Sequence, residues 1–221
     1  EGQIVTDAKA AIRHLVVCAS PAPAGFGHAV VDAYVDAVTK AGQQAIVRDL
    51  YGIGFDPVLK ADERPDAPHW APSADVAAEL EFVRQASILV LVYPIWYGLP
   101  PAILKGYVDR VLGANYSFHR FRNEAGQPPL VGKPLLSFST SGTPLAWLHE
   151  RSQILALREI FDVYLWRGFG MKQSRHVMLD EVVANMPAAA AAEKLQLVRQ
   201  AAAETCATLA GERPMMTGFE A

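Results

Sequence analysis

An uninterrupted apolar run near the middle of the chain constrains the fold more than any other feature. Residues 86–92 read Ala-Ser-Ile-Leu-Val-Leu-Val, a pattern typical of a strand buried on both faces of a parallel sheet. Trp96, Tyr97 and Gly98 follow, and then a predicted helix whose first turn holds Pro101. The two aromatic residues are therefore expected on a loop at the carboxyl end of a central strand, the edge where open α/β sheets bind ligands.

Two exposed aromatic side chains on such a loop would form a flat apolar ledge beside backbone amide groups. A planar heteroaromatic ring is the ligand that fits this ledge best. The alternative is that Trp96 and Tyr97 only cap the core or build a subunit contact.

Strand and helix patterns alternate along the chain, which predicts an α/β fold: a doubly wound, five-stranded parallel sheet with helices on both faces. The expected strands are Ile12–Cys18, Gln44–Asp49, Ile88–Val92, Pro134–Ser139 and Arg175–Leu179. The expected helical segments are Phe26–Ala41, Ala74–Gln85, Pro101–Leu112, Trp147–Gly168 and Pro187–Leu209.

The length of 221 residues fits one large domain. We expect an N-terminal extension over 1–11, the domain over 12–211 and an extended tail over 212–221. Residues 50–72 are rich in Pro, Asp and Gly, and this stretch is too long for an idle loop in a compact domain. It is either an excursion over the ligand-binding edge or a dimer arm.

Composition excludes several classes of protein. The net charge is −3 and no basic cluster appears, which argues against a nucleic-acid partner. No apolar run is long enough for a membrane span, and the first residues do not read as a signal peptide. Cys18 and Cys206 need not pair, so a cytoplasmic protein is expected. The HExxH, CxxC and GxSxG motifs are absent, and no sequence cluster of His and Cys predicts a metal.

The loop after the first strand has the features of a phosphate site. It runs from Ser20 to His28, and Gly25 and Gly27 precede or open a helix. The N-terminus of a helix offers unpaired amide groups and a partial positive charge, glycines allow close approach, and Ser20 could add a hydroxyl. The alternative is a plain strand-to-helix turn in which the glycines only relieve strain.

The loop after the fourth strand concentrates short polar groups, namely Ser139, Thr140, Ser141 and Gly142. Such a loop suits the carbonyl oxygens and nitrogens of a polar ring, or it is an ordinary turn. A flavin nucleotide has both a phosphate and such a ring, and FMN binds at this switch point of related sheets. A hydrolase that uses Ser139 or Ser141 with His149 as base is a minor alternative.

A longer motif resembles one family. The stretch Pro94–Val111 reads PxWxxxxPAILKGxxDRV, and residues 49–51 and 55–59 also match. They are similar to the flavodoxin-fold NAD(P)H:quinone oxidoreductases. The resemblance implies a flavodoxin-like sheet, a bound FAD or FMN and NAD(P)H as hydride donor. It also implies a homodimer and two-electron reduction of a quinone or a similar small-molecule acceptor.

The resemblance also assigns residues. Tyr116 and Phe118 would line the substrate pocket from the partner subunit, and Tyr116 would either hydrogen-bond the acceptor as a catalytic residue or form an aromatic wall. His149 would match the pocket histidine. His119 and Arg120 would contact NAD(P)H or be solvated. The flavin ring loop would hold Pro94, Ile95, Trp96 and Tyr97, its polar edge would meet Ser139, Thr140, Ser141 and Gly142, and the phosphate would meet Ser20, Gly25, Phe26 and Gly27.

Three positions depart from the family pattern. The family usually has His where this chain has Ser20, Ser at Gly25 and Asn at Gly27. These changes remove side-chain donors to phosphate and leave backbone amides. A regulatory or ancillary flavodoxin-like binding protein without turnover therefore stays an alternative, as does a one-electron carrier, although carriers are usually shorter and more acidic.

Overall fold

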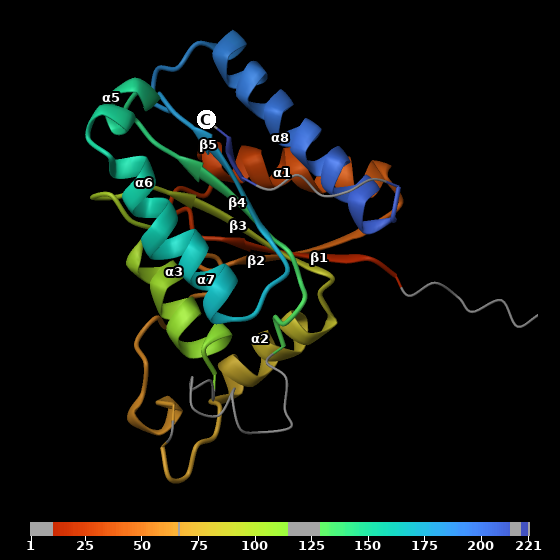
Figure 1. Ribbon diagram of the computed structural model, residues 1–221, viewed down its shortest axis with the longest axis vertical. Coiled ribbons are helices and arrows are strands. Elements are labelled where there is room, and N and C mark those ends of the chain that lie inside the picture. Colours follow the sequence, from red (N-terminus) through yellow and green to blue (C-terminus); the bar gives the residue numbers. More distant parts are fainter. Residues whose placement is uncertain (1–10, 66, 115–128, 213–217, 221) are drawn as a thin grey trace, which may run out of the picture.

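The computed structural model describes residues 11–65, 67–114, 129–212 and 218–220. Its centre is a parallel sheet with the strand order β2-β1-β3-β4-β5-β6 (Figure 1). The five predicted strands are confirmed, each within two residues of its expected limits. Their bounds are Arg13–Cys18 for β1, Gln44–Asp49 for β2, Ile88–Pro94 for β3, Leu135–Thr140 for β4 and Ser174–Leu179 for β5.

A sixth strand extends the predicted sheet at one edge. Strand β6, Gly218–Glu220, pairs in parallel with β5, so that Arg175 lies opposite Gly218. It falls in the segment that the sequence predicts to be an extended tail. Three residues are too few for an alternating pattern to be recognised, so no strand is predicted there from the sequence.

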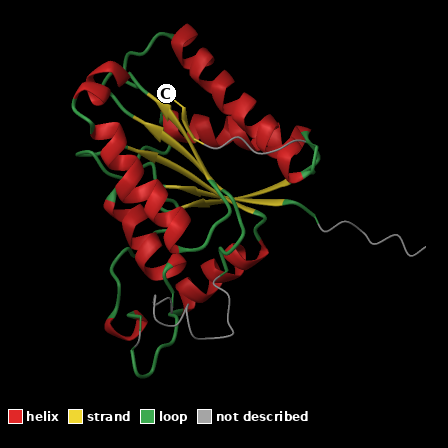
Figure 2. Cartoon of the chain, viewed as in Figure 1, coloured by secondary structure: helices red, strands yellow, loops and turns green. Residues whose placement is uncertain are grey.

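Helices cover both faces of the sheet, as Figure 2 shows. Val90 and Val92 pack on one side with helix α1, Phe26–Lys40, and helix α8, Ala188–Leu209. Leu89 and Leu91 pack on the other side. Because successive residues of β3 point to opposite faces and both faces are covered, an unbroken apolar run is what this strand requires. The second layer contains α2, Ala74–Gln85, α3, Ala102–Tyr107, α5, Leu145–Glu150, α6, Gln153–Leu157, and α7, Tyr164–Gly168.

Two predicted helices are less regular than the sequence indicates. Helix α3 continues as a π-helical turn, η2, over Val108–Leu112. The predicted helix Trp147–Gly168 is interrupted at Ser152, which has a φ of 57°, and a π-helical turn, η3, covers Arg158–Val163 between α6 and α7. Within the described ranges, no helix is long and apolar enough to cross a membrane.

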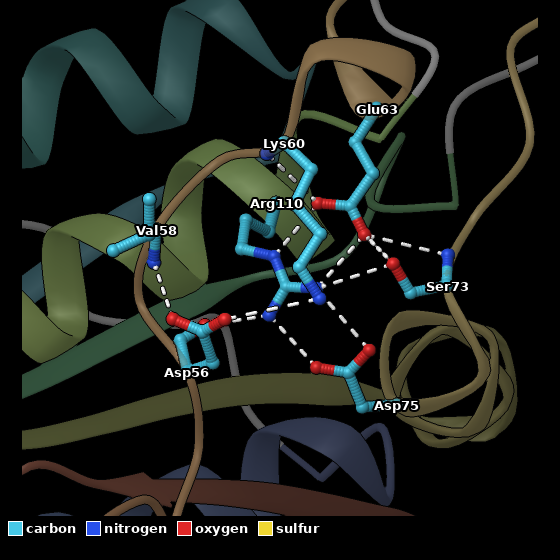
Figure 3. Close-up of polar contacts among 7 residues, drawn as sticks. All are labelled: Asp56, Val58, Lys60, Glu63, Ser73, Asp75 and Arg110. Carbon is cyan, nitrogen blue, oxygen red and sulfur yellow. Dashed lines mark hydrogen bonds and ion pairs between the residues drawn. The ribbon is translucent and has the colours of Figure 1, made fainter.

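The segment 50–72, which we call the arm, contains one short 3₁₀ turn, η1, over Ala61–Glu63. Arg110 of η2 fastens the arm to the domain (Figure 3). Its guanidinium makes two hydrogen bonds of 2.8 Å to Glu63 and two of 2.7 and 3.1 Å to Asp75 on α2. It also donates to the backbone carbonyl of Asp56 at 2.5 Å. A planar fork of five donors suits this set of acceptors, which come from the arm and from α2.

The Arg110 ion pair predicts a specific pH dependence of stability. The hydrogen bonds from Arg110 are the largest cause that lowers the pKa of Glu63 to about 2, against 4.5 for a free carboxyl. A depressed pKa gives stability that is present above pH 4.5 and is lost as the pH falls through 2. We therefore expect the free energy of unfolding to fall over this range. Replacing Glu63 with Gln should flatten the curve there, which denaturant melts in a pH series will check.

Gly106 lets the arm lie directly on helix α3. A Cβ atom at this position would lie inside contact distance of the backbone of Pro57. The arm and helix α3 therefore touch without an intervening side chain. We expect Gly106→Ala to push the arm away and to lower the free energy of unfolding by about 1–3 kcal/mol, the usual cost of overpacking. Gly168→Ala is the control, because its Cβ would meet only the Tyr164 ring at 3.8 Å. Equal denaturation midpoints for both variants would contradict this explanation.

Candidate functional site

The carboxyl edge of the sheet brings the predicted loops together. Hydrogen bonds continue the ladder beyond the strands: the Ala19 amide donates to Val92, and the Ile95 amide donates to Thr140 at 2.8 Å. The Ser141 amide donates to the Leu179 carbonyl at 2.9 Å. Neighbouring loops are thus held side by side by backbone contacts.

The loop over residues 20–28, which we call the phosphate-type loop, contains the N-terminus of α1, which begins at Phe26. Gly25 is the N-cap residue, and no side chain caps the first turn. A Cβ atom on Gly25 would meet Ala22 at 2.9 Å, and one on Gly27 would meet the Ser20 hydroxyl oxygen at 2.7 Å. The loop is therefore a close-packed cradle that needs glycine at both positions, and its amide groups fit an anion without side-chain donors. In this sense Ser20 and Gly27 are matched to one another.

The aromatic loop after β3 is a tight turn. Trp96 and Leu99 exchange two backbone hydrogen bonds of 2.9 and 3.1 Å. Tyr97 and Gly98 lie between them with φ values of 51° and 83°, the signs that a type I′ turn requires at both central positions. Trp96 is 44% exposed and Tyr97 is fully exposed, so both rings face solvent as expected from the sequence. A bulky residue with positive φ is uncommon, and such strain is concentrated at functional sites.

The loop after β4 is only partly available to a ligand. Ser141 is buried, and its hydroxyl accepts a hydrogen bond from the Thr143 amide at 3.0 Å. Thr140 is also nearly buried, whereas Gly142 is exposed. The Leu145 amide donates to Asp180 at 3.0 Å, which ties the start of α5 to the end of β5. A ligand here would meet Gly142 and the loop backbone rather than a row of hydroxyls.

Ser139 points into the protein. Its hydroxyl lies 2.6 Å from Nε2 of His176, whose Nδ1 lies 2.5 Å from Asp162, and all three side chains are buried. The order Ser-His-Asp is that of a hydrolase triad, but Ser139 has no exposed surface that a substrate could reach. This buried chain joins β4, β5 and η3 behind the loop. Its one trace in the sequence is the alternation along β4, which puts Ser137 and Ser139 on the same face.

The other predicted site residues are His149 and four residues of the segment after η2. His149 lies exposed on α5 and is not the partner of Ser139, so its pocket role remains a prediction. Tyr116 and Phe118 lie outside the described residues, as do His119 and Arg120.

A second group of polar side chains lies beside the phosphate-type loop. Nε2 of His28 lies 3.1 Å from a carboxylate oxygen of Asp49. Burial, with smaller contributions from the carboxylates of Asp49 and Asp32, raises the pKa of the nearby Cys18 thiol to about 11. No sequence pattern links Cys18, His28 and Asp49, because they come from β1, α1 and β2.

The order of the strands, the switch point between β1 and β3 and the loops at the carboxyl edge define an open α/β sheet of the flavodoxin type. The chain belongs to the Flavodoxin_2 family, described as a flavodoxin-like fold, which matches residues 12–204.

Two relatives carry oxidoreductase names. An uncharacterized NAD(P)H oxidoreductase of Haemophilus influenzae is 33% identical over 133 residues, which is 60% of this chain and 65% of that protein. NAD(P)H dehydrogenase (quinone) 1 of Rattus norvegicus is 28% identical over 149 residues, which is 59% of this chain and 54% of that protein. The chain thus spans less than two thirds of the length of either relative.

Solved structures share the fold over most of the chain. The NAD(P)H:quinone oxidoreductase from Methanothermobacter marburgensis has a TM-score of 0.76 at 22% identity, covering 89% of this chain and 96% of its own. An FMN-dependent NADH-azoreductase from Bacillus anthracis in complex with FMN has a TM-score of 0.65 at 14% identity, covering 88% and 99%. At these identities the likeness concerns the fold.

Proposed function

We propose that this protein is a flavin-dependent NAD(P)H oxidoreductase that passes two electrons to a quinone or a similar acceptor. One observation carries the proposal: the glycine cradle before α1 and the exposed turn Trp96–Leu99 lie on loops that follow β1 and β3, the neighbouring strands at the switch point. The names of the relatives agree with it.

The phosphate of FMN, or of the FMN half of FAD, would bind at the amide groups around Phe26 and Gly27. The N-terminus of a fifteen-residue helix supplies partial positive charge there, and no acidic residue lies in its first turn. The fit does not need the histidine, serine and asparagine that the family usually has, because the backbone donates and Gly27 leaves room for the approach.

The ring would bind between the two other loops. Trp96 and Tyr97 would cover one side, and the backbone at Gly142 would face its polar edge. Donors fixed in advance at the place where negative charge develops are the most effective form of electrostatic help. The buried chain from Ser139 through His176 to Asp162 would hold this loop in place from below. The chemistry that a bound flavin supplies is the transfer of two electrons from NAD(P)H to the acceptor.

An absorbance spectrum before and after anaerobic addition of NADPH, and then of NADH, tests this function. We expect flavin bands in the purified or FMN-reconstituted protein, bleaching by one of the two nucleotides and recovery on addition of a quinone. Flavin bands that neither nucleotide bleaches would favour a carrier. A protein that binds neither FMN nor FAD would favour the regulatory alternative, which the missing side-chain donors at Ser20, Gly25 and Gly27 would explain.

We also propose that the chain forms a homodimer through the second helical layer. A groove there is lined by residues of the arm, α3, η2, η3 and α7, and four of them are charged: Lys105, Asp109, Glu159 and Arg167. Two of its apolar residues, Ile160 and Tyr164, are 63% and 70% exposed. We expect Ile160→Asp to convert the dimer to a monomer, since it would bury an unpaired charge in the interface. Light scattering after gel filtration measures this, with Leu197→Asp on the exposed side of α8 as the control. A monomeric wild type would contradict the proposal.

A further inference from the structure

Three potential metal ligands from separate elements meet beside the phosphate-type loop. Cys18 ends β1, His28 lies in the first turn of α1 and Asp49 ends β2. The sulfur, one ring nitrogen and one carboxylate oxygen all lie within 4.8 Å of one another. The fold thus gathers a thiol, an imidazole and a carboxylate that are ten or more residues apart in the sequence.

The spacing is close to what a tetrahedral metal ion needs. Ligand atoms bound at about 2.0–2.3 Å in a tetrahedron are about 3.3–3.8 Å apart. The three ligand atoms, one from each side chain, lie no more than 4.8 Å apart, so no pair is more than about 1 Å wider than this range. A metal ion at this place would have to draw the three ligand atoms together by no more than that distance.

The surroundings favour a cation over a simple ion pair. Among the residues that the structure describes, Nδ1 of His28 is buried without a hydrogen-bond partner, so one ring nitrogen is unexplained by the His28–Asp49 pair. The second carboxylate oxygen of Asp49 is held by the Tyr51 amide at 3.2 Å, which fixes its orientation as an outer hydrogen bond does for a metal ligand.

Exposure indicates how an ion would enter. Cys18 is fully buried, whereas the side chains of His28 and Asp49 are 22% and 30% exposed. A metal would therefore reach the thiol from the surface between α1 and the end of β2. Three protein ligands leave one position for water or another oxygen ligand, an arrangement that is common for zinc sites with an open coordination place.

We propose that Cys18, His28 and Asp49 form a binding site for a divalent transition-metal ion of the zinc class. Sulfur, nitrogen and oxygen donors together select zinc-like ions over Mg²⁺ and Ca²⁺, which take oxygen ligands. The ion joins the ends of β1 and β2 to the first turn of α1, next to the loop that contains Gly27. Binding to the folded state alone raises the melting temperature. The site does not depend on flavin or on the proposed oxidoreductase function.

Titration of flavin-free, chelator-treated, reduced protein with Co²⁺ tests the site directly. We expect a thiolate-to-cobalt charge-transfer band that saturates at one ion per chain, loss of the band when Zn²⁺ displaces cobalt, and a Zn²⁺-dependent rise in melting temperature. Loss of an outer partner of a metal ligand already lowers affinity about 10- to 100-fold. We therefore expect Cys18→Ser, His28→Gln and Asp49→Asn each to weaken binding by more than about 100-fold.

Matched controls separate this site from general metal binding. Cys206→Ser replaces the other buried cysteine, and His69→Gln replaces an exposed histidine. Both should bind cobalt as the wild type does. If Cys18→Ser does not fold, the variants at the partly exposed His28 and Asp49 still decide the question. Binding below half an equivalent, or equal affinity in the His28 and Asp49 variants, would overturn the proposal and leave a structural ion pair.

Discussion

Replacing Arg110 with alanine is expected to lower the free energy of unfolding by about 3–5 kcal/mol, because it breaks a buried ion pair. The guanidinium has no exposed surface, and Glu63 beside it is 3% exposed. The variant would leave that carboxylate buried without its counter-ion and would free the arm from η2 and α2. Denaturant melts monitored by far-ultraviolet circular dichroism measure the loss.

An exposed arginine provides the comparison for this variant. Arg84 pairs with Glu81 at 3.6 Å, and both side chains are more than half exposed. Arg84→Ala should therefore cost no more than about 1 kcal/mol. A loss at Arg110 as small as that at Arg84 would show that the arm is not held by this network. The loss of stability in Arg110→Lys should lie between those of Arg110→Ala and Arg84→Ala, because one ammonium group cannot make two hydrogen bonds to each of the two carboxylates.

The role of Arg110 marks the limit of what the sequence could predict. The stretch that contains it reads as part of a family motif, and Gly106 lies in the same motif. Each of these two residues contacts the arm, some fifty positions earlier in the chain, and this contact explains why the fold needs it. Such contacts leave no local pattern, since a buried arginine and an exposed one look the same in sequence.

The sheet could be predicted because each strand carries its own signal. The buried apolar run of β3 and the alternation of strand and helix patterns were sufficient to predict the order of the elements along the chain. Small errors arise at the ends: β3 and β4 continue to Pro94 and Thr140, where they remain paired. That one-residue extension of β4 places Ser139 inside the strand. Its hydroxyl therefore meets His176 rather than a ligand, although the sequence predicted it at the loop surface.

The predicted loops of the candidate site were easier to find than the contacts that shape them. The aromatic turn follows from Trp96 and Tyr97 lying after a buried strand. The link between Ser20 and Gly27 is different, because it depends on how closely β1 and α1 approach. From the sequence alone, Ser20 and Gly27 look like positions that have lost a phosphate donor. In the fold, the side chain of Ser20 fills the space that the missing side chain of Gly27 leaves.

Gly27→Ala is expected to weaken FMN binding by about 10- to 100-fold. Its Cβ would lie 2.7 Å from the hydroxyl oxygen and 2.8 Å from the Cβ of Ser20, so rotation of the hydroxyl alone cannot relieve the clash. Overpacking of this kind costs about 1–3 kcal/mol, and each 1.4 kcal/mol corresponds to about tenfold in affinity. Fluorescence quenching of FMN in a titration gives the dissociation constants.

The clash has a partner, so a second substitution should remove it. In a Ser20→Gly background, Gly27→Ala should change FMN affinity less than about threefold, and the difference between the two backgrounds is the coupling free energy of the pair. Gly168→Ala is the matched control away from the ligand loops, because its Cβ would meet only the Tyr164 ring at an ordinary 3.8 Å. The wild type, the two single variants at Ser20 and Gly27 and the double variant can also be compared by thermal melting without flavin. Coupling that appears in the melts but not in FMN binding would mean that the cradle is structural and that the phosphate binds elsewhere.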